Sequence, residues 1–172
     1  KNQIEFRDAL SEIRKTLPQV KYALAASESG AGYVQAFKDR ARDLGLTDAV
    51  IWAGRLSKDE VRAFYADIDV AITTHRNEGF GIWVLEALAA GKPVVAFDAG
   101  GVRDSLEGCP AGILVSGGAH EMATEILRVL TDRSRYEQMA KAGPQWVLDR
   151  FTRDRMIEDY FTFFTSAGGK NR

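Results

Sequence analysis

Residues 69–97 read DVAITTHRNEGFGIWVLEALAAGKPVVAF, two short apolar runs separated by a loop and a helical segment. The runs at 69–73 and 94–97 do not alternate between apolar and polar residues, which is typical of strands buried on both faces of a parallel sheet. Between them, residues 82–90 carry a helical pattern that ends at Gly91. A strand, a helix and a second buried strand make up the unit from which α/β folds are built.

The same alternation continues on both sides of this unit. Further buried strands are expected at residues 21–26, 49–53 and 112–115, and helices at 6–17, 34–44, 57–68, 120–130, 135–146 and 153–164, with a short helical stretch after Gly100-Gly101. The third of these helices starts with Ser57 and Glu60, which can form a capping box, and Phe64, Tyr65 and Ile68 are expected to face the core. The expected fold class is α/β, a doubly wound parallel sheet with C-terminal helices. In such a fold a strand should precede the first helix, so a central strand is expected to be missing from the N-terminus.

Length and composition are those of one globular domain. The chain has 172 residues, of which 45% are hydrophobic and 27% charged, values that exclude a disordered or fibrous protein. The chain has 23 basic and 24 acidic residues, so its net charge is close to zero. This net charge supports neither a nucleic-acid partner nor binding to an anionic membrane. No apolar run approaches the ~18 residues of a membrane span. The single cysteine, Cys109, suits a reducing compartment, and we expect a cytoplasmic domain over residues 1–165 with a tail at 166–172.

The loop after the strand at 69–73 has the features of an anion site. Gly79 and Gly81 allow the backbone to approach a ligand closely. A helix that starts at Ile82 presents unpaired main-chain amides, which attract negative charge. Open α/β sheets bind ligands at the carboxyl ends of their strands, so a phosphate or pyrophosphate is the expected ligand.

Two carboxylates flank this anion site, Glu78 in the loop and Glu86 in the second turn of the helix. A carboxylate repels a phosphate but accepts hydrogen bonds from the paired hydroxyls of a sugar or a ribose. A sugar-phosphate ligand is therefore one interpretation of the spacing. The spacing alone leaves a second one open, in which Glu78 is solvated and Glu86 stabilises the helix through its dipole.

The order of these motifs resembles that of retaining GT-B glycosyltransferases, in particular family 4 of the nucleotide-sugar-dependent enzymes (glycosyl transferases group 1). The similarity rests on seven segments that follow one another in the family's order and spacing. They are residues 50–56, 65–70, 78–81, 86–87, 91–96, 100–101 and 111–115. Enzymes of this family contain two Rossmann-like halves, and residues 1–130 resemble the C-terminal half, which binds the donor.

The resemblance implies a role for each matching residue. Glu78 would be the catalytic residue and contact hydroxyls near the anomeric carbon, and Glu86 would bind the ribose diol. The amides of Gly81 and Ile82 would bind the distal phosphate. Lys1 looks like the lysine that the family places on the diphosphate. The donor-binding residues implied in this way are Lys1, Arg55, Leu56, Phe80, Gly81, Ile82 and Glu86.

The function implied is that of a hexosyltransferase in glycan biosynthesis, which moves a sugar from a nucleoside-diphosphate sugar to an acceptor. No cofactor and no metal are expected. The partners would be the nucleotide-sugar donor and an N-terminal GT-B domain that carries the acceptor site and any peripheral membrane contact. Without that domain, little or no transfer is expected. The alternatives are an NDP-sugar epimerase or phosphorylase-type enzyme of this architecture, and a non-catalytic module that binds a partner protein.

Several positions depart from the family pattern. Residues 74–77 (Thr-His-Arg-Asn) stand where the family often has Pro-Ser, and Asp104 stands in place of a Glu. These departures bear on the identity of the donor. His75 is expected to be a polar loop residue, with a contact to phosphate as the alternative. Gly100-Gly101 either approaches the donor or forms a tight turn. Four aromatic residues at 160–164 cannot share one helix face, which indicates a partner surface.

Overall fold

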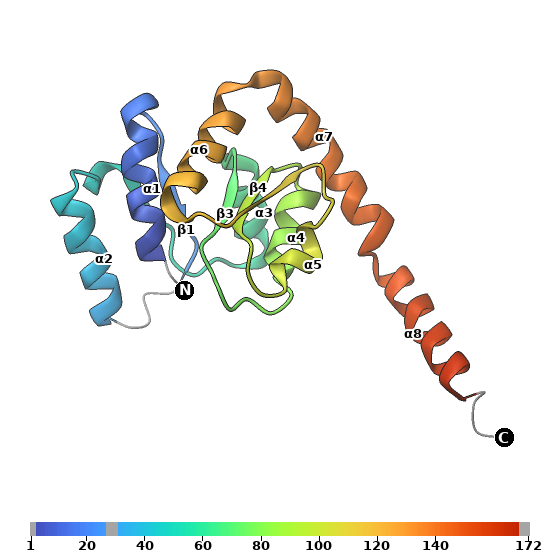
Figure 1. Cartoon of the computed structure of the whole chain (residues 1–172). Helices are drawn as coiled ribbons and strands as arrows, with labels where there is room; N and C mark the ends of the chain where they lie inside the picture. Colours follow the sequence, from blue (N-terminus) through green and yellow to red (C-terminus); the bar gives the residue numbers. More distant parts are fainter. Residues whose placement is uncertain (1–2, 27–30, 169–172) are drawn as a thin grey trace.

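The structure, a computed structural model, describes residues 3–26 and 31–168 (Figure 1). Within them, parallel strands alternate with helices, which confirms the expected α/β class. The strands are β1 (Tyr22–Leu24), β2 (Val50–Trp52), β3 (Ala71–Thr73), β4 (Val94–Phe97) and β5 (Gly112–Val115). The helices are α1 (Gln3–Thr16), α2 (Ala31–Asp43), α3 (Lys58–Asp67), α4 (Ile82–Ala89), α5 (Val102–Leu106), α6 (Gly118–Thr131), α7 (Arg133–Arg150) and α8 (Arg153–Gly168), with a 3-10 turn η1 at Thr47–Ala49.

Local sequence signals account for where most of these elements begin and end. At the start of α3 the capping box is present: the Ser57 N–H donates to Glu60 Oε2 at 2.7 Å, and the Glu60 N–H donates to Ser57 Oγ at 3.4 Å. Strands β1, β2 and β3 are shorter than the runs expected at 21–26, 49–53 and 69–73. Among the described strands, each of these three pairs with a neighbour along one edge only. A strand is therefore defined only as far as that one neighbour continues to form hydrogen bonds with it.

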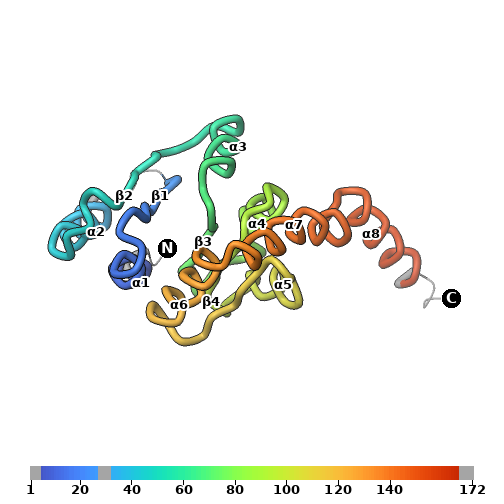
Figure 2. Tube along the Cα trace, turned by 90° about the horizontal axis from the view of Figure 1, so that it is seen from above, coloured from blue at the N-terminus to red at the C-terminus, as the bar shows by residue number. Residues whose placement is uncertain are grey.

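The described strands form two separate parts of the parallel sheet. β1 pairs with β2, and β3, β4 and β5 form a separate sheet in that order, all in parallel. No described strand joins β1 to β3, and Figure 2 shows the two parts side by side. The division falls where the sequence pattern leaves out a central strand.

The core lies on both faces of β4, the most deeply buried strand. Val95 and Phe97 pack into a cluster with Leu10 of α1 and Met122 of α6. The residues between them, such as Val94, pack on the opposite face in a cluster with residues of α4, α5 and α7. Helices therefore cover both faces of the three-stranded part, as a doubly wound sheet requires.

Helix α3 is less buried than its sequence predicts. Phe64, Tyr65 and Ile68 were expected to face the core, but no residue of α3 is fully buried. All three line a cavity between the two parts of the sheet. The apolar face of α3 is therefore directed inward as expected: Tyr65 and Ile68 pack against the second core cluster, while part of their surface also borders the cavity.

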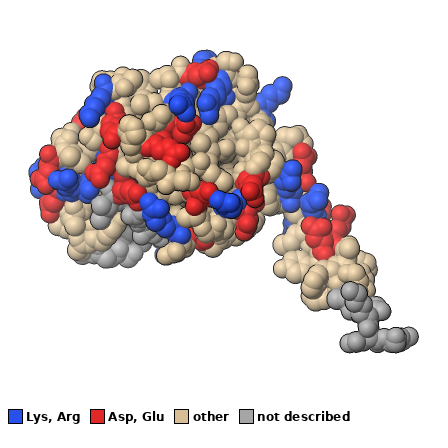
Figure 3. Space-filling view, viewed as in Figure 1, with Lys and Arg blue, Asp and Glu red and all other residues tan. Residues whose placement is uncertain are grey.

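Helix α8 projects away from the rest of the molecule (Figure 1). It continues to Gly168, past residue 165, at which the expected domain ends. Phe161, Phe163 and Phe164 on this helix are each at least 64% exposed. On the visible face of the molecule, acidic and basic side chains are interspersed (Figure 3). Among the described residues, no helix has the length and the apolar character needed to cross a membrane.

Candidate functional site

The candidate site is built on the loop that connects β3 to α4. This loop follows the carboxyl end of β3 and turns into α4 at Gly81, whose φ of 75° and ψ of 54° are left-handed. A residue with a side chain rarely adopts this conformation, and an added Cβ would also lie 3.3 Å from Val84. No side chain caps the start of α4, so its first turn offers main-chain amides to a ligand, as expected.

Residues at the start and in the middle of α5 form hydrogen bonds with this loop. The Gly101 amide donates to the Glu78 carbonyl at 3.0 Å, and Ser105 Oγ donates to the Phe80 carbonyl at 2.8 Å. A Cβ on Gly101 would lie 1.7 Å from the carbonyl oxygen of Gly79, so only glycine fits here. Gly100-Gly101 was expected either to approach the donor or to form a tight turn. The structure favours the tight turn, because the Gly101 amide already donates a hydrogen bond to the loop.

Glu78 is held by the side chain of His75. His75 Nδ1 lies 2.6 Å from Glu78 Oε2, and both side chains are about three-quarters buried, with 20% and 24% of their surface exposed. An ionised carboxylate can only accept, so the ring donates this hydrogen bond. The bond from His75 is the main reason that the pKa of Glu78 lies below its usual value, with smaller contributions from the Trp83 side chain and the Gly79 main chain. Glu78 is therefore kept ionised.

Glu86 has a different partner. The Tyr65 hydroxyl of α3 lies 3.3 Å from Glu86 Oε2 and 3.1 Å from the Trp83 carbonyl oxygen. Burial, followed by the charge of Glu86, raises the pKa of Tyr65, so this phenol stays protonated and able to donate. Since Trp83 also contacts Glu78, a continuous series of contacts links the two carboxylates through the first turn of α4.

The other residues implied by the resemblance fall into three groups. Phe80 and Ile82 lie on the same loop and helix start as Glu78, and are 45% and 67% exposed. Arg55 and Leu56 lie in the connection between β2 and α3, and no described contact joins them to Glu78 or Glu86. Lys1 lies outside the described residues.

Sequence reasoning missed two supports of the site. Tyr65 was expected to be an apolar contact, but its hydroxyl binds Glu86. The signal was available, because a tyrosine on a buried helix face needs a hydrogen-bond partner for its hydroxyl. Ser105 was not singled out, although it contacts the loop at Phe80 and accepts a hydrogen bond from Trp146 Nε1 at its carbonyl, at 3.1 Å.

Two residues outside the loop have other surroundings. His120 lies on α6, where Nδ1 is 2.8 Å from Glu12 Oε2. Cys109 is buried, and burial raises the pKa of its thiol, so it is not an activated nucleophile. No group of three or more histidine, cysteine, aspartate or glutamate side chains in the described part of the chain could hold a metal ion.

Comparison with protein families and curated proteins supports the resemblance. The family model "Glycosyl transferases group 1" matches residues 1–146. A GDP-mannose-dependent alpha-(1-6)-phosphatidylinositol monomannoside mannosyltransferase of Mycobacterium tuberculosis is 32% identical over 164 residues. That match covers 91% of this chain and 42% of the relative, so the chain spans less than half the length of the curated protein.

Solved structures give the same result. The crystal structure of Anabaena Alr3699/HepE in complex with UDP-glucose matches with a TM-score of 0.85 and 26% identity, over 96% of this chain and 45% of that one. The C-terminal domain of a glycosyl transferase group 1 family protein (LpcC) from Francisella tularensis matches with a TM-score of 0.79 and 22% identity, over 89% and 80% of the two chains. The second match supports the fold alone.

Proposed function

Because this chain belongs to the glycosyl transferases group 1 family, we propose that it is the donor-binding half of a retaining glycosyltransferase. The full-length protein would transfer a hexose from a nucleoside-diphosphate sugar to an acceptor. An N-terminal GT-B domain would carry the acceptor site. The proposal involves no cofactor and no metal.

The observation that carries the proposal is the pair of carboxylates on either side of the uncapped start of α4. The main-chain amides of Gly81 and Ile82 suit the distal phosphate, because a helix start attracts anions. Glu86 lies one to two turns along the same helix, where it would accept hydrogen bonds from the ribose diol. Glu78, kept ionised by His75, would accept hydrogen bonds from hydroxyls of the donor sugar.

This arrangement would assist transfer chiefly through electrostatics. As the bond between the anomeric carbon and the diphosphate breaks, negative charge develops on the distal phosphate, next to the amides of the α4 start. Preorganised donors at such a position stabilise the transition state more than the ground state. Glu78 would accept hydrogen bonds from the sugar while the anomeric carbon of the sugar becomes electron-poor. The negative charge of Glu78 would stabilise the positive charge that develops there. The acceptor oxygen then forms the new bond on the face that the diphosphate left, and the proton of the acceptor hydroxyl passes to the leaving diphosphate.

The first test is calorimetric titration of the full-length protein with UDP, GDP and ADP, followed by their sugar conjugates. The mycobacterial relative is named for GDP-mannose and the Anabaena protein was solved with UDP-glucose, so both bases belong in the series. We expect one diphosphate to bind, and Glu86→Gln to weaken it about 10- to 100-fold, the effect of losing a hydrogen bond to a charged group.

The matched control is Glu137→Gln, an exposed glutamate on α7 that lies outside the site. It should leave the affinity unchanged. If no diphosphate binds, or if Glu86→Gln and Glu137→Gln behave alike, the chain is a non-catalytic module or Glu86 has been assigned wrongly.

A further inference from the structure

Helix α7 runs back along α4 toward the candidate site. A Cβ on Gly91, just past the end of α4, would lie 3.1 Å from the Ala140 carbonyl oxygen of α7. A Cβ on Gly143 of α7 would lie 2.7 Å from the Leu88 carbonyl oxygen of α4. The two helices therefore touch through their main chains, an approach that glycine permits. Because α7 packs so closely against α4, the end of α7 has a defined place beside the loop that leads into α4.

The end of α7 contacts the side chain of Phe80 in that loop. The ring of Phe151, the residue that follows α7, has its centre 5.8 Å from that of the Phe80 ring, with an angle of 63° between the planes. This is an edge-to-face arrangement, which aromatic pairs prefer. The Phe151 amide donates to the Val147 carbonyl at 2.9 Å, which ties Phe151 to the last turn of α7. Since 45% of Phe80 is exposed, its ring is not enclosed by the core, and the Phe151 ring restricts its movement.

The main chain of Phe80 is held by a second route that also starts on α7. Trp146 Nε1 donates to the Ser105 carbonyl at 3.1 Å, and Ser105 Oγ donates to the Phe80 carbonyl at 2.8 Å. Ser105 is fully buried, so solvent does not compete for its hydroxyl. The Phe80 carbonyl and the Gly81 amide belong to one planar trans peptide, in which C=O and N–H point in opposite directions. The bond that fixes the carbonyl toward Ser105 therefore directs the Gly81 N–H away from α5.

We propose that Phe151 and Trp146 are positioning residues for the donor diphosphate, and that both act through Phe80. This inference rests on the function proposed above, in which the Gly81 amide binds the distal phosphate. The Phe151 ring fixes the side chain of Phe80, and Trp146 fixes its carbonyl through Ser105. The Gly81 N–H is thereby held in one direction before the donor arrives, so binding does not have to order it.

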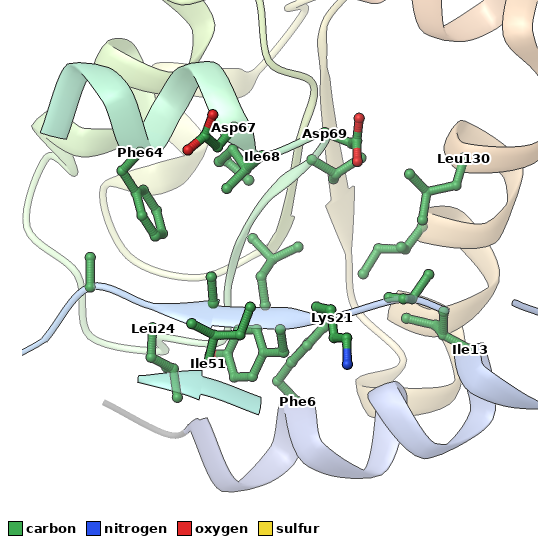
Figure 4. Close-up of a pocket in the computed structure, with 18 of the residues that line it drawn as sticks. Phe6, Ile13, Lys21, Leu24, Ile51, Phe64, Asp67, Ile68, Asp69 and Leu130 are labelled. Carbon is green, nitrogen blue, oxygen red and sulfur yellow. The ribbon is translucent and has the colours of Figure 1, made fainter. Parts of the chain in front are cut away.

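The two positioning residues are separate from the cavity of about 1080 Å³ between the two parts of the sheet (Figure 4). The described lining of that cavity includes His75 and Trp83 of the candidate site, but neither Phe151 nor Trp146. A change at Phe151 or Trp146 therefore acts on the loop from the side of α7 and not through the cavity.

The positioning concerns one part of the donor, the distal phosphate. A nucleoside monophosphate contains the base, the ribose and the proximal phosphate but lacks the distal one. Loss of the positioning should therefore weaken the binding of a diphosphate and leave the binding of the matching monophosphate unchanged. General damage to the domain would weaken both.

The test is calorimetric titration of the full-length protein with UDP, GDP and ADP and with UMP, GMP and AMP. Phe151→Ala should weaken diphosphate binding about 2- to 10-fold, the range expected for the loss of one aromatic pair, with monophosphate binding unchanged. Phe151→Leu keeps an apolar side chain at this position and should show the same selective loss, also where the alanine variant does not fold. Trp146→Phe keeps a ring but removes the Nε1 donor, and should give a selective loss of about twofold.

The matched control is Leu148→Ala, an exposed apolar residue of the same helix. It should leave both affinities unchanged. Equal weakening of diphosphate and monophosphate binding in the two Phe151 variants would mean that Phe151 only supports the fold, and would overturn the inference.

Unchanged diphosphate binding in the Phe151 variants would overturn it as well. In both cases the unmodified protein still binds its diphosphate, so the proposed function stands while the positioning role fails. If the unmodified protein binds none of the three diphosphates, the proposed function fails and the inference fails with it.

Discussion

Glu78 and Glu86 are eight positions apart in the sequence, yet the structure positions them in different ways. Glu78 lies in a loop, and its place depends on His75 at 2.6 Å and on the Gly101 amide at 3.0 Å from its carbonyl oxygen. Glu86 lies on α4, which is anchored by fully buried residues such as Leu88, and the Tyr65 hydroxyl lies 3.3 Å from Glu86 Oε2.

The difference indicates how each carboxylate responds to change. A loop held by tertiary contacts moves when one of those contacts is lost, whereas a residue in a packed helix keeps its place through the helix itself. Changes around Glu78 should therefore affect the transfer step strongly. Changes around Glu86 should affect nucleotide affinity moderately. Three substitutions in the full-length protein test this distinction.

The largest effect is expected for Gly101→Ala. The new methyl group would occupy the position of the Gly79 carbonyl oxygen, so the loop that carries Glu78 must shift. Because a displacement of about 1 Å can lower a rate ~100-fold, we expect that loss in the turnover number, kcat, of sugar transfer. Nucleoside-diphosphate affinity should fall less, about threefold, because Glu86 and the Ile82 amide stay in place on α4 and only the loop up to Gly81 shifts.

Gly32→Ala is the matched control, because Gly32 lies in α2 with open space where its Cβ would be. It should leave both quantities unchanged. Equal losses of transfer and affinity in Gly101→Ala would mean that the two carboxylates are not positioned independently.

A smaller effect is expected for His75→Ala. Loss of the bond to Glu78 should lower kcat about tenfold, the low end for a charge-assisted hydrogen bond, with little change in KM. The same bond lowers the pKa of Glu78, so its removal lets that pKa rise. Glu78 would then become protonated at a higher pH, and the acid limb of the pH–rate profile should move upward.

The control is His120→Ala, which changes the other histidine of the chain and leaves the loop intact. A pH profile that is identical in His75→Ala and in the unmodified protein would show that His75 does not control Glu78.

The smallest effect is expected for Tyr65→Phe. This change removes the hydroxyl that Glu86 contacts but keeps the ring. One hydrogen bond contributes about 0.5–1.5 kcal/mol, so nucleoside-diphosphate affinity should fall about 2- to 10-fold with no change in the pH profile. Tyr160→Phe, on the exposed α8, is the comparison. If Tyr65→Phe lowered the transfer rate as much as Gly101→Ala does, the assignment of Glu78 to transfer and of Glu86 to nucleotide binding would be wrong.

The parts of the fold that depend on local sequence could be predicted. The capping box at Ser57, the start of α4 at Gly81 and the buried run at 94–97 each follow from residues close together in the chain. The position of the two carboxylates at the carboxyl end of β3 followed from the same local pattern and from the family resemblance.

The supports of the site could not be predicted in the same way. The hydroxyl of Tyr65 reaches Glu86 across 21 positions, and the amide of Gly101 reaches Glu78 across 23. Such contacts depend on how α3 and α5 pack against α4, which no local pattern determines. For the same reason, the apolar pattern of α3 predicted the direction of this face but not its degree of burial: Tyr65 and Ile68 pack against the second core cluster, yet no residue of α3 is fully buried.

The contacts of Arg76 indicate when the site forms during folding. Its guanidinium donates to Glu5 at 2.8 Å and lies 4.6 Å from the centre of the Phe97 ring, so it fastens the loop to both α1 and the sheet. The two partners of the ion pair are 71 residues apart. Contacts that close long stretches of chain form late, because the entropy of closure must be overcome first. The loop that carries Glu78 is therefore expected to reach its final position in the last stage of folding, after α1 has docked.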